Sequence, residues 1–234
     1  FTSSLAKPGQ ISGMENASRM NLFWQNTNNV TYNTSFGDHH LTATAVFEAS
    51  GAEGRNLKLT GSDLANEFVG YWNAKNAKTR DGENGYSAEA IVSGLGRIMY
   101  NYKGKYMLTG TFRADGSSRF SSDNRWGYFP SVALAWKINE EAFMKKLTWW
   151  NEFKFRLGWG MTGQQDINSD FGYETHYTSS DSFAQYPFGD TYYGTMRPSA
   201  YNPDLKWETT TTYNAGLDLG FLNNRISANI DGYY

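Results

Sequence analysis

The chain has 234 residues, with 21 lysines and arginines against 23 aspartates and glutamates, and its net charge of −2 gives no electrostatic case for nucleic-acid binding. It contains no cysteine, which excludes disulfide frameworks and thiolate metal sites. Aromatic residues make up 17% of the chain, yet no stretch approaches the roughly 20 consecutive apolar residues that a membrane-spanning helix needs.

Alternation of apolar and polar residues predicts β-strands along the whole chain. Val30, Tyr32 and Phe36 alternate with polar residues, and after a turn at Gly37 the same parity resumes over 41–47. Similar runs follow at 98–102, 106–112, 132–138, 153–159, 213–221 and 226–230. The pattern predicts about eight strands, many of them near the roughly 10 residues that a tilted membrane strand requires.

The connections between these strands alternate between short and long. The short ones lie at 37–39, 103–105, 139–148 and 222–225, and the long ones at 51–86, 115–126 and 163–206. Alternate connections of an up-and-down antiparallel sheet lie at the same end, so one end should carry tight turns and the other long loops. This arrangement is typical of outer-membrane barrels, whose tight turns are periplasmic and whose long loops are extracellular. We therefore predict an all-β fold that is part of a large up-and-down antiparallel transmembrane β-barrel.

Aromatic residues gather near the short-turn end of the predicted strands. Rings with a polar tip settle at the level of lipid headgroups, so these residues are candidate membrane-interface contacts. They are Tyr100, Tyr102, Tyr106, Trp136, Trp149, Trp150 and Phe221. A soluble β-sandwich remains the alternative, because alternation shows only that one face of each strand is buried.

Four stretches carry a resemblance to a known family. They read GRIMYNYKGKYMLTGTFRADGSSRF at 96–120, WGYFPSVALAWKINEEAF at 126–143, FKFRLGWGMTGQQDI at 153–167 and YNPDLKWETTTTYNAGLDLGFLNNRISANIDGYY at 201–234. A weaker fifth stretch, NTNNVTYNTSFGDHHLTATAVFE, lies at 26–48. In order and spacing they resemble the barrel of the SusC/RagA-type TonB-dependent transporters of Bacteroidota outer membranes.

The resemblance implies a barrel of about 22 strands that is closed around an N-terminal plug. It also implies a SusD-like surface lipoprotein as partner, and import of glycans or peptides with force delivered by TonB. We expect residues 1–234 to be a segment from the C-terminal half of such a multi-pass barrel, in contact with outer-membrane lipid. We find neither a plug domain nor a TonB box in the chain, so TonB would act through a missing N-terminal region.

No motif points to catalysis. Nucleophile elbows, Walker sequences and zinc-protease motifs are missing from the sequence, and we expect no enzyme activity, no cofactor and no metal site. Asp38, His39 and His40 are expected to form a solvated turn, and Asp115 and Gly116 to start a loop. Glu140, Glu141, Lys145 and Lys146 suggest a short helix at the periplasmic rim, whose charges pair across a turn.

Functional contacts are expected in the long loops, where rings occur in segments that should be polar. Flat rings can stack on sugars, bury peptide side chains or pack on a lipoprotein lid, and we favour partner or loop packing over direct ligand contact. The candidates are Trp72, Trp126, Tyr173, Tyr177, Tyr186, Tyr192, Tyr193 and Tyr201.

Three functions stay open from the sequence. The first is nutrient import through the barrel. The second is a SusC-like barrel that serves as a structural or docking subunit of another outer-membrane complex. The third and weakest is a soluble, aromatic-rich, carbohydrate-binding β-domain, which would need no detergent. The substrate cannot be inferred, because it depends on the loops.

Overall fold

A computed structural model describes residues 13–64, 73–166, 172–179 and 185–234. The chain divides into two compact units, one formed by residues 1–24 and 51–89 and the other by residues 25–50 and 90–234. Within the described residues, no helix is both long and apolar enough to cross a membrane.

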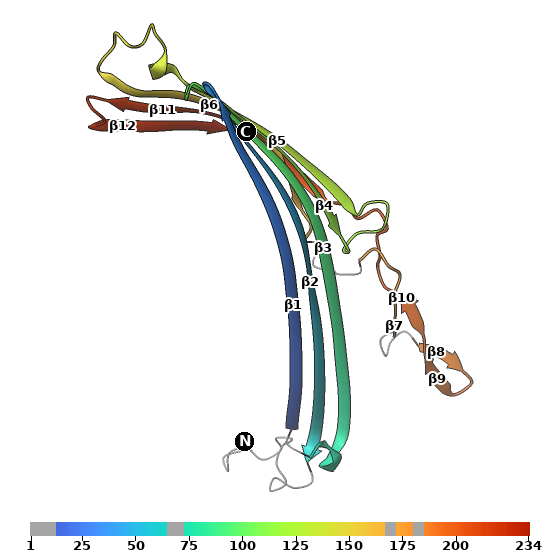
Figure 1. Cartoon of the computed structure of the whole chain (residues 1–234). Coiled ribbons are helices and arrows are strands. Elements are labelled where there is room, and N and C mark those ends of the chain that lie inside the picture. Colours follow the sequence, from blue (N-terminus) through green and yellow to red (C-terminus); the bar gives the residue numbers. More distant parts are fainter. Residues whose placement is uncertain (1–12, 65–72, 167–171, 180–184) are drawn as a thin grey trace, which may run out of the picture. The chain divides into compact units, whose positions relative to one another are not determined.

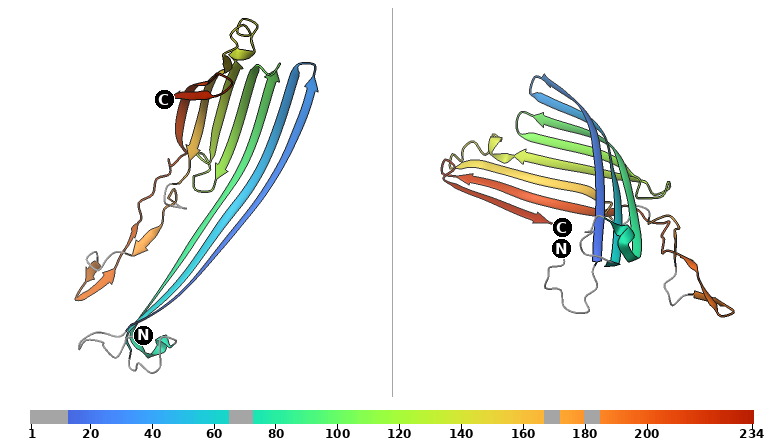
Figure 2. Two further views of the ribbon diagram at one scale, coloured as in Figure 1. Left: turned by 90° about the vertical axis from the view of Figure 1, so that its left-hand side faces the viewer. Right: turned by 90° about the horizontal axis from the view of Figure 1, so that it is seen from below.

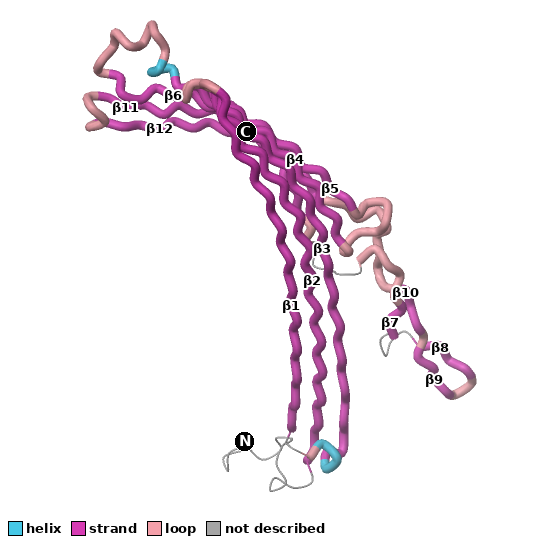
Figure 3. The backbone as a smooth tube through the Cα atoms, in the orientation of Figure 1, coloured by secondary structure: helices cyan, strands magenta, loops and turns pink. Residues whose placement is uncertain are grey.

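The main structure is a sheet of eight strands in the order β1-β2-β3-β4-β5-β6-β11-β12, which is an antiparallel up-and-down arrangement (Figure 1). It confirms the predicted fold class. The only helical elements among the described residues are two 3-10 turns, η2 (Ala74–Asn76) and η3 (Ile138–Glu140), drawn in cyan in Figure 3. The eight strands are β1 (Gly13–Phe36), β2 (His39–Leu64), β3 (Ala77–Tyr102), β4 (Tyr106–Ser117), β5 (Trp126–Lys137), β6 (Trp150–Gln164), β11 (Glu208–Phe221) and β12 (Ile226–Tyr233).

The prediction of a loop at 51–86 is wrong for most of that range. Strand β2 continues to Leu64 and β3 begins at Ala77, so strand structure occupies all but the middle of that range. Strand β1 likewise begins at Gly13, well before the first predicted strand. The extensions of β2 and β3 are mostly polar, and in the extension of β1 the apolar residues, among them Phe23 and Trp24, are adjacent instead of strictly alternating. No clear apolar alternation therefore reveals these extensions, whereas their backbone groups still pair with neighbouring strands.

In the first unit, ion pairs and one close approach at a glycine connect neighbouring polar strands. Lys58 forms an ion pair with Glu15 at 3.1 Å, and Lys78 forms one with Asp63 at 2.7 Å. Met14 and Ala77 are buried on either side of Gly61, where an added Cβ would lie 2.8 Å from the Cβ of Ala77. A glycine at this position therefore allows the close approach.

The other two predicted loops are partly strand as well. β4 runs to Ser117 and β5 begins at Trp126, which shortens the loop predicted at 115–126 to residues 118–125. The described residues of the long insertion predicted at 163–206 carry four short strands in two small sheets, where β7 pairs with β10 and β8 with β9. These strands are β7 (Tyr177–Ser179), β8 (Gln185–Phe188), β9 (Thr191–Gly194) and β10 (Met196–Pro198).

The register of the second unit separates its side chains into two faces. Figure 2 shows β4, β5, β6 and β11 side by side, coloured from green through yellow to red. Trp136 of β5 lies opposite Tyr106 of β4 and Phe155 of β6, so the three share one face. The next row on that face is Leu108, Leu134, Leu157 and Ala215. The opposite face carries Thr109, Lys137, Lys154, Arg156 and Asp218.

A compact hydrophobic core lies at the loop end of the second unit. Phe120, Phe129 and Trp207 are 0%, 6% and 9% exposed and pack against one another, with Ile91 and Leu205 around them. The ring centroids of Phe120 and Trp207 are 5.4 Å apart, and those of Phe129 and Trp207 are 5.3 Å apart. This core joins the β4–β5 connection to the segment that enters β11.

Candidate functional site

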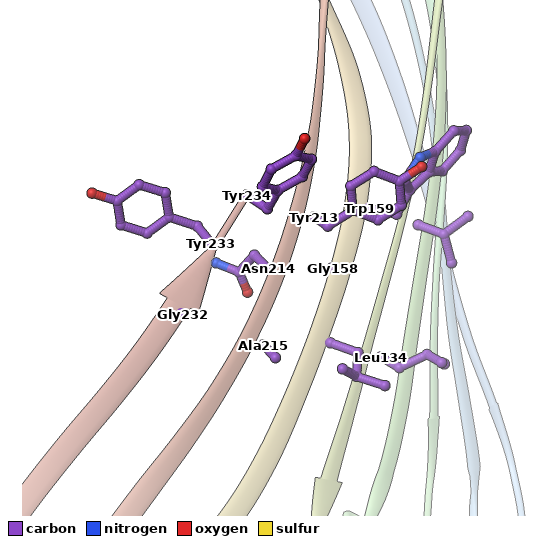
Figure 4. Close-up of a pocket in the computed structure, with 11 residues that line it drawn as sticks. Leu134, Gly158, Trp159, Tyr213, Asn214, Ala215, Gly232, Tyr233 and Tyr234 are labelled. Carbon is purple, nitrogen blue, oxygen red and sulfur yellow. The ribbon is translucent and has the colours of Figure 1, made fainter.

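The apolar face of the second unit is a wall of exposed aliphatic and aromatic side chains. Leu134, Trp159 and Tyr213 line one shallow groove of about 600 Å³ on this wall (Figure 4). Ile98, Leu108, Val132 and Ile230 are also exposed. Soluble proteins rarely expose large contiguous apolar patches to water, so these neighbouring exposed side chains suit contact with an apolar solvent.

Four of the predicted interface rings form a row with two residues from the first hairpin. Phe36 stacks on His39 at 5.1 Å between ring centroids, and His39 lies 4.7 Å from Tyr102. Tyr102 stacks on Tyr106, and Tyr106 on Trp136, each at 6.3 Å. The hydroxyl of Tyr100 also lies 2.6 Å from Nδ1 of His39, so all four predicted rings belong to this ring row.

The expectation that His39 belongs to a solvated turn is wrong. His39 begins β2, and its half-buried ring lies between those of Phe36 and Tyr102. Only Gly37 and Asp38 form the turn itself, and Gly37 adopts a φ of 61° there. The sequence pattern placed the turn correctly but gave no sign that a neighbouring hairpin would supply an aromatic partner.

The polar tips of two rings in this row, Tyr106 and Trp136, meet at one carboxylate. The Tyr106 hydroxyl donates to Oε1 of Glu141 at 2.6 Å, and the Trp136 indole donates to the same oxygen at 3.2 Å. Lys105 reaches the other oxygen at 3.4 Å. The hydrogen bond from Tyr106, followed by those from Trp136 and Lys105, lowers the pKa of Glu141 below its ordinary value. Glu141 is therefore a charged anchor for the rim, whereas the sequence suggested pairing with Lys145 and Lys146.

The remaining predicted interface rings form a second cluster. Trp150 lies 4.5 Å from Phe221 and 4.9 Å from Phe153, and Trp149 stacks on Phe221 at 5.9 Å. Trp149 and Trp150 stand 5.0 Å apart. The structure thus gathers the predicted interface rings into two groups at the short-turn end, and their contact with lipid headgroups stays a prediction.

The polar face carries an ion-pair network that sequence reasoning did not identify. Arg156 donates from Nε to both carboxylate oxygens of Asp218 at 3.0 Å, and from Nη2 to Asp218 at 2.7 Å and to Asp231 at 2.9 Å. Lys154 lies 3.5 Å from Asp218. The network joins β6, β11 and β12, and charged residues at polar-face positions were the only signal of it in the sequence.

Gly216 makes this bridge possible. It lies directly opposite Arg156 on one side and Asp231 on the other, in the strand that the bridge must cross. A Cβ at this position would collide with the carboxylate of Asp231 and would lie 2.8 Å from Nη2 of Arg156. Arginine can therefore reach over β11 only because that strand has no side chain there.

The core at the loop end fixes the base of the long insertion. The Trp207 indole donates to the carbonyl of Arg125 at 3.0 Å, and Ser121 donates to the carbonyl of Pro203 at 3.2 Å. Arg119 forms an ion pair with Asp166 at 3.0 Å. Residues near the start and near the end of the insertion are therefore both attached to the β4–β5 connection.

A small hairpin in the insertion presents several of the predicted loop rings. Tyr186 of β8 lies opposite Tyr193 of β9, and Phe188 makes an edge-on contact with Tyr193 at 6.5 Å. These three side chains share one face and are mostly exposed, while Tyr192 lies on the other face opposite Pro187. We call the group of Tyr186, Phe188 and Tyr193 the hairpin ring face. Phe188 was not among the principal sequence candidates.

The other predicted loop rings do not join this face. Trp126 begins β5, with its ring over Gly116, and Tyr177 lies on β7. Tyr201 is exposed. Burial and the neighbouring Glu174 raise the pKa of Tyr173. Trp72 lies outside the described residues. Among the residues with described placement, no ring contact links Trp126, Tyr173, Tyr177 or Tyr201 to the hairpin ring face.

Within the described part of the chain, no group of three or more histidine, aspartate or glutamate side chains could hold a metal ion. The arrangement that the structure offers is a two-faced wall with aromatic rims, a fixed loop base and a projecting ring-bearing hairpin.

Comparison with known proteins gives a family match over almost the entire chain. Residues 2–234 match the family described as TonB dependent receptor-like, beta-barrel. The chain is 56% identical over 158 residues to the TonB-dependent receptor SusC of Bacteroides thetaiotaomicron, which covers 68% of this chain and 16% of SusC. It is 33% identical over 234 residues to the TonB-dependent receptor P39 of Formosa agariphila, which covers 96% of this chain and 21% of that protein.

Solved structures agree with this relationship. The structure of the RagAB peptide transporter matches with a TM-score of 0.81 at 25% identity, over 95% of this chain and 24% of the solved one. The RagAB peptide importer in its closed-closed state matches with a TM-score of 0.79 at 26% identity, over 94% of this chain and 24% of that one. The chain thus spans about a fifth of the length of the curated relatives that it matches.

The matches explain why an exposed apolar face and a polar face occur on the same strands. The alternative of a soluble carbohydrate-binding domain is set aside by the same findings. This chain belongs to the SusC/RagA-like group of TonB-dependent receptors, as part of an outer-membrane β-barrel.

Proposed function

We propose that the protein containing this chain imports large nutrients, glycans or peptides, across the outer membrane in a TonB-dependent manner. The observation that carries this proposal is the 56% identity to SusC over 158 residues. The solved relatives described as a peptide transporter and a peptide importer support the same class of activity. TonB would act through a part of the protein outside this chain.

The two faces of the wall support a role as part of a conduit. Its apolar face can meet lipid, and the face with Arg156, Asp218 and Asp231 can line a hydrated interior. In the ion-pair network, Arg156 and Lys154 balance the charges of Asp218 and Asp231 across three strands.

The partner proposed here is a SusD-like surface lipoprotein that covers the long-loop end. The hairpin ring face offers exposed rings of the kind that are enriched at protein interfaces. The core around Trp207 and the ion pair between Arg119 and Asp166 fix the base from which the insertion leaves the sheet. A projecting hairpin with a fixed base suits contact with such a lid.

Import is tested by deleting the gene in its native host and comparing growth on single glycans and on peptide mixtures. We expect loss of growth on one nutrient class, with recovery when the full-length gene is restored. Normal growth on every class, together with failure of another outer-membrane complex to assemble, would favour the docking-subunit alternative.

The hairpin ring face is tested by replacing Tyr186, Phe188 and Tyr193 with serine in the full-length protein. We expect the lipoprotein to be lost on gentle purification while the barrel remains folded. Retention of the lipoprotein with reduced nutrient binding would instead assign the rings to the ligand. Tyr201→Ser is a matched control, since Tyr201 is an exposed tyrosine outside the hairpin.

A further inference from the structure

The connection between β5 and β6, residues 138–149, is folded rather than loose. We call it the rim segment. It begins with η3, and the amide of Glu141 then donates to the carbonyl of Ile138 at 3.0 Å. The amide of Lys145 donates to the carbonyl of Glu141 at 3.2 Å, and that of Leu147 to the carbonyl of Met144 at 2.8 Å. Consecutive turns of this kind give the segment a defined surface.

Both ends of the rim segment are attached to the apolar face of the sheet. Near its start, Glu141 accepts hydrogen bonds from Tyr106 and Trp136, which belong to that face. At its end, Trp149 stacks on Phe221, and the carbonyl of Trp149 accepts from the amide of Leu222 at 3.1 Å. The segment therefore lies along the border of the lipid-facing surface.

The rim segment exposes apolar and cationic side chains together. Phe143 is 64% exposed and Leu147 is 40% exposed, and the exposed Lys145 and Lys146 lie between them in sequence. In water, exposed apolar groups gain nothing from this arrangement. At the edge of a bilayer the ring and the aliphatic chain can enter the apolar zone, while the ammonium groups stay at the level of the phosphates.

The charges near this segment favour an anionic partner. Glu141 is already engaged by Lys105, and the carboxylate of Glu140 accepts a hydrogen bond from the side-chain amide of Asn139 at 3.3 Å. Glu140 is exposed at the start of the segment, and Lys145 and Lys146 are exposed together toward its end. With Lys105 counted, three cationic side chains face two carboxylates here, so the local charge is positive. Lysines close to a membrane surface attract anionic lipid headgroups.

We propose that the rim segment binds an anionic phospholipid. Lys145 and Lys146 would hold the phosphate group, and Phe143 and Leu147 would enter the acyl region beside it. A groove of about 640 Å³ on the adjacent apolar face, lined by Tyr106, Leu108 and Trp136 among others, gives an acyl chain room next to the Glu141 anchor. Barrels of this class carry their short turns on the periplasmic side, so the lipid would come from the periplasmic leaflet.

The test uses the full-length protein, purified in detergent and stripped of lipid. Phosphatidylglycerol and phosphatidylcholine are titrated separately, and bound lipid is counted by native mass spectrometry. We expect tighter binding of phosphatidylglycerol. Lys145→Gln with Lys146→Gln should weaken that binding about thirtyfold, because each lysine near an anionic headgroup contributes about a factor of five. Binding of phosphatidylcholine should be unchanged.

Two further variants complete the test. Phe143→Ser with Leu147→Ser should weaken the binding of phosphatidylglycerol and of phosphatidylcholine to a similar extent, because the acyl contact does not depend on headgroup charge. Lys75→Gln with Lys206→Gln removes two exposed lysines from other parts of the chain and should leave both affinities unchanged. The proposal is overturned if the unmodified protein binds both lipids equally, or if the Lys145 and Lys146 variant keeps its preference for phosphatidylglycerol. Circular dichroism confirms the strand content of each variant.

Discussion

The two ends of the second unit use aromatic residues in opposite ways. At the short-turn end, the rings of Tyr102, Tyr106 and Trp136 form a row along the apolar face, and Tyr106 and Trp136 give their polar tips to one carboxylate. At the loop end, Phe120, Phe129 and Trp207 pack into a buried core. Rings such as Tyr106 remain exposed in the first arrangement, whereas the second arrangement buries its rings.

The difference follows from the solvent that each end meets. Lipid is itself apolar, so a ring on the lipid-facing surface gains little by packing on another ring, and its hydrogen-bonding tip decides its position. A ring in a water-exposed loop gains most when it is buried. The same residue types therefore form an anchor row at one end and a core at the other.

The largest effect is expected from opening the core at the loop end. Trp207→Ala should destabilise the β4–β5 connection and the base of the insertion by about 3–5 kcal/mol, the usual range for removing a buried aromatic side chain. Limited proteolysis of the full-length protein should then show faster cleavage within residues 165–206. Trp126→Ala is the control, because half of the Trp126 side chain is already exposed. Equal cleavage of the two variants would contradict a core that holds the insertion.

A smaller loss of stability is expected from a change on the polar face, between the two ends of the second unit. Gly216→Val would place a side chain between Arg156 and Asp231 and should cost about 1–3 kcal/mol, as overpacking usually does. Thermal unfolding followed by circular dichroism measures the change. Gly232→Ala on the adjoining strand is the matched control, since nothing lies within 4 Å of an added Cβ there. An unchanged melting temperature for Gly216→Val would show that the three-strand bridge does not support the wall.

The anchor at the short-turn end should reveal itself through pH. Hydrogen bonds from Tyr106 and Trp136 lower the pKa of Glu141 in the folded protein, so its contribution to stability is complete above the unfolded value of about 4.3 and is lost as the pH falls through the lowered pKa. Glu141→Gln should therefore lower the melting temperature at pH 7. At pH 3, the difference in melting temperature between this variant and the unmodified protein should be smaller. A difference that is the same at both values would mean that the charge of Glu141 plays no part.

The smallest change in stability is expected at the hairpin ring face. Tyr186→Ala with Tyr193→Ala removes exposed rings outside any buried core, so the free energy of unfolding should change by no more than about 0.5 kcal/mol per residue. Chemical denaturation of the full-length protein checks this. A larger loss of stability would show that the rings pack within the protein and are not free to contact a partner.

Several features could be predicted from the sequence because they depend on local periodicity. Alternation at 98–112 and 132–138 identified strands and assigned Tyr106, Leu108, Leu134 and Trp136 to one face, and the register confirms that assignment. Gly37 and Gly104 marked tight turns, where they adopt positive φ angles of 61° and 67°, respectively. Side chains of consecutive strand residues point to opposite faces, so the pattern is written directly into the chain.

Other features could not be predicted, because they join residues far apart in the chain. The strand extensions over 51–64 and 77–86 carry polar residues on both faces, so only backbone pairing with a neighbour reveals them. Glu141 meets Tyr106 across 35 residues, Arg156 meets Asp231 across 75, and Trp207 meets Arg125 across 82. Periodicity determined which face each side chain occupies, and only the tertiary register decided which charges and rings meet, because a contact across strands depends on alignment that a single strand does not encode.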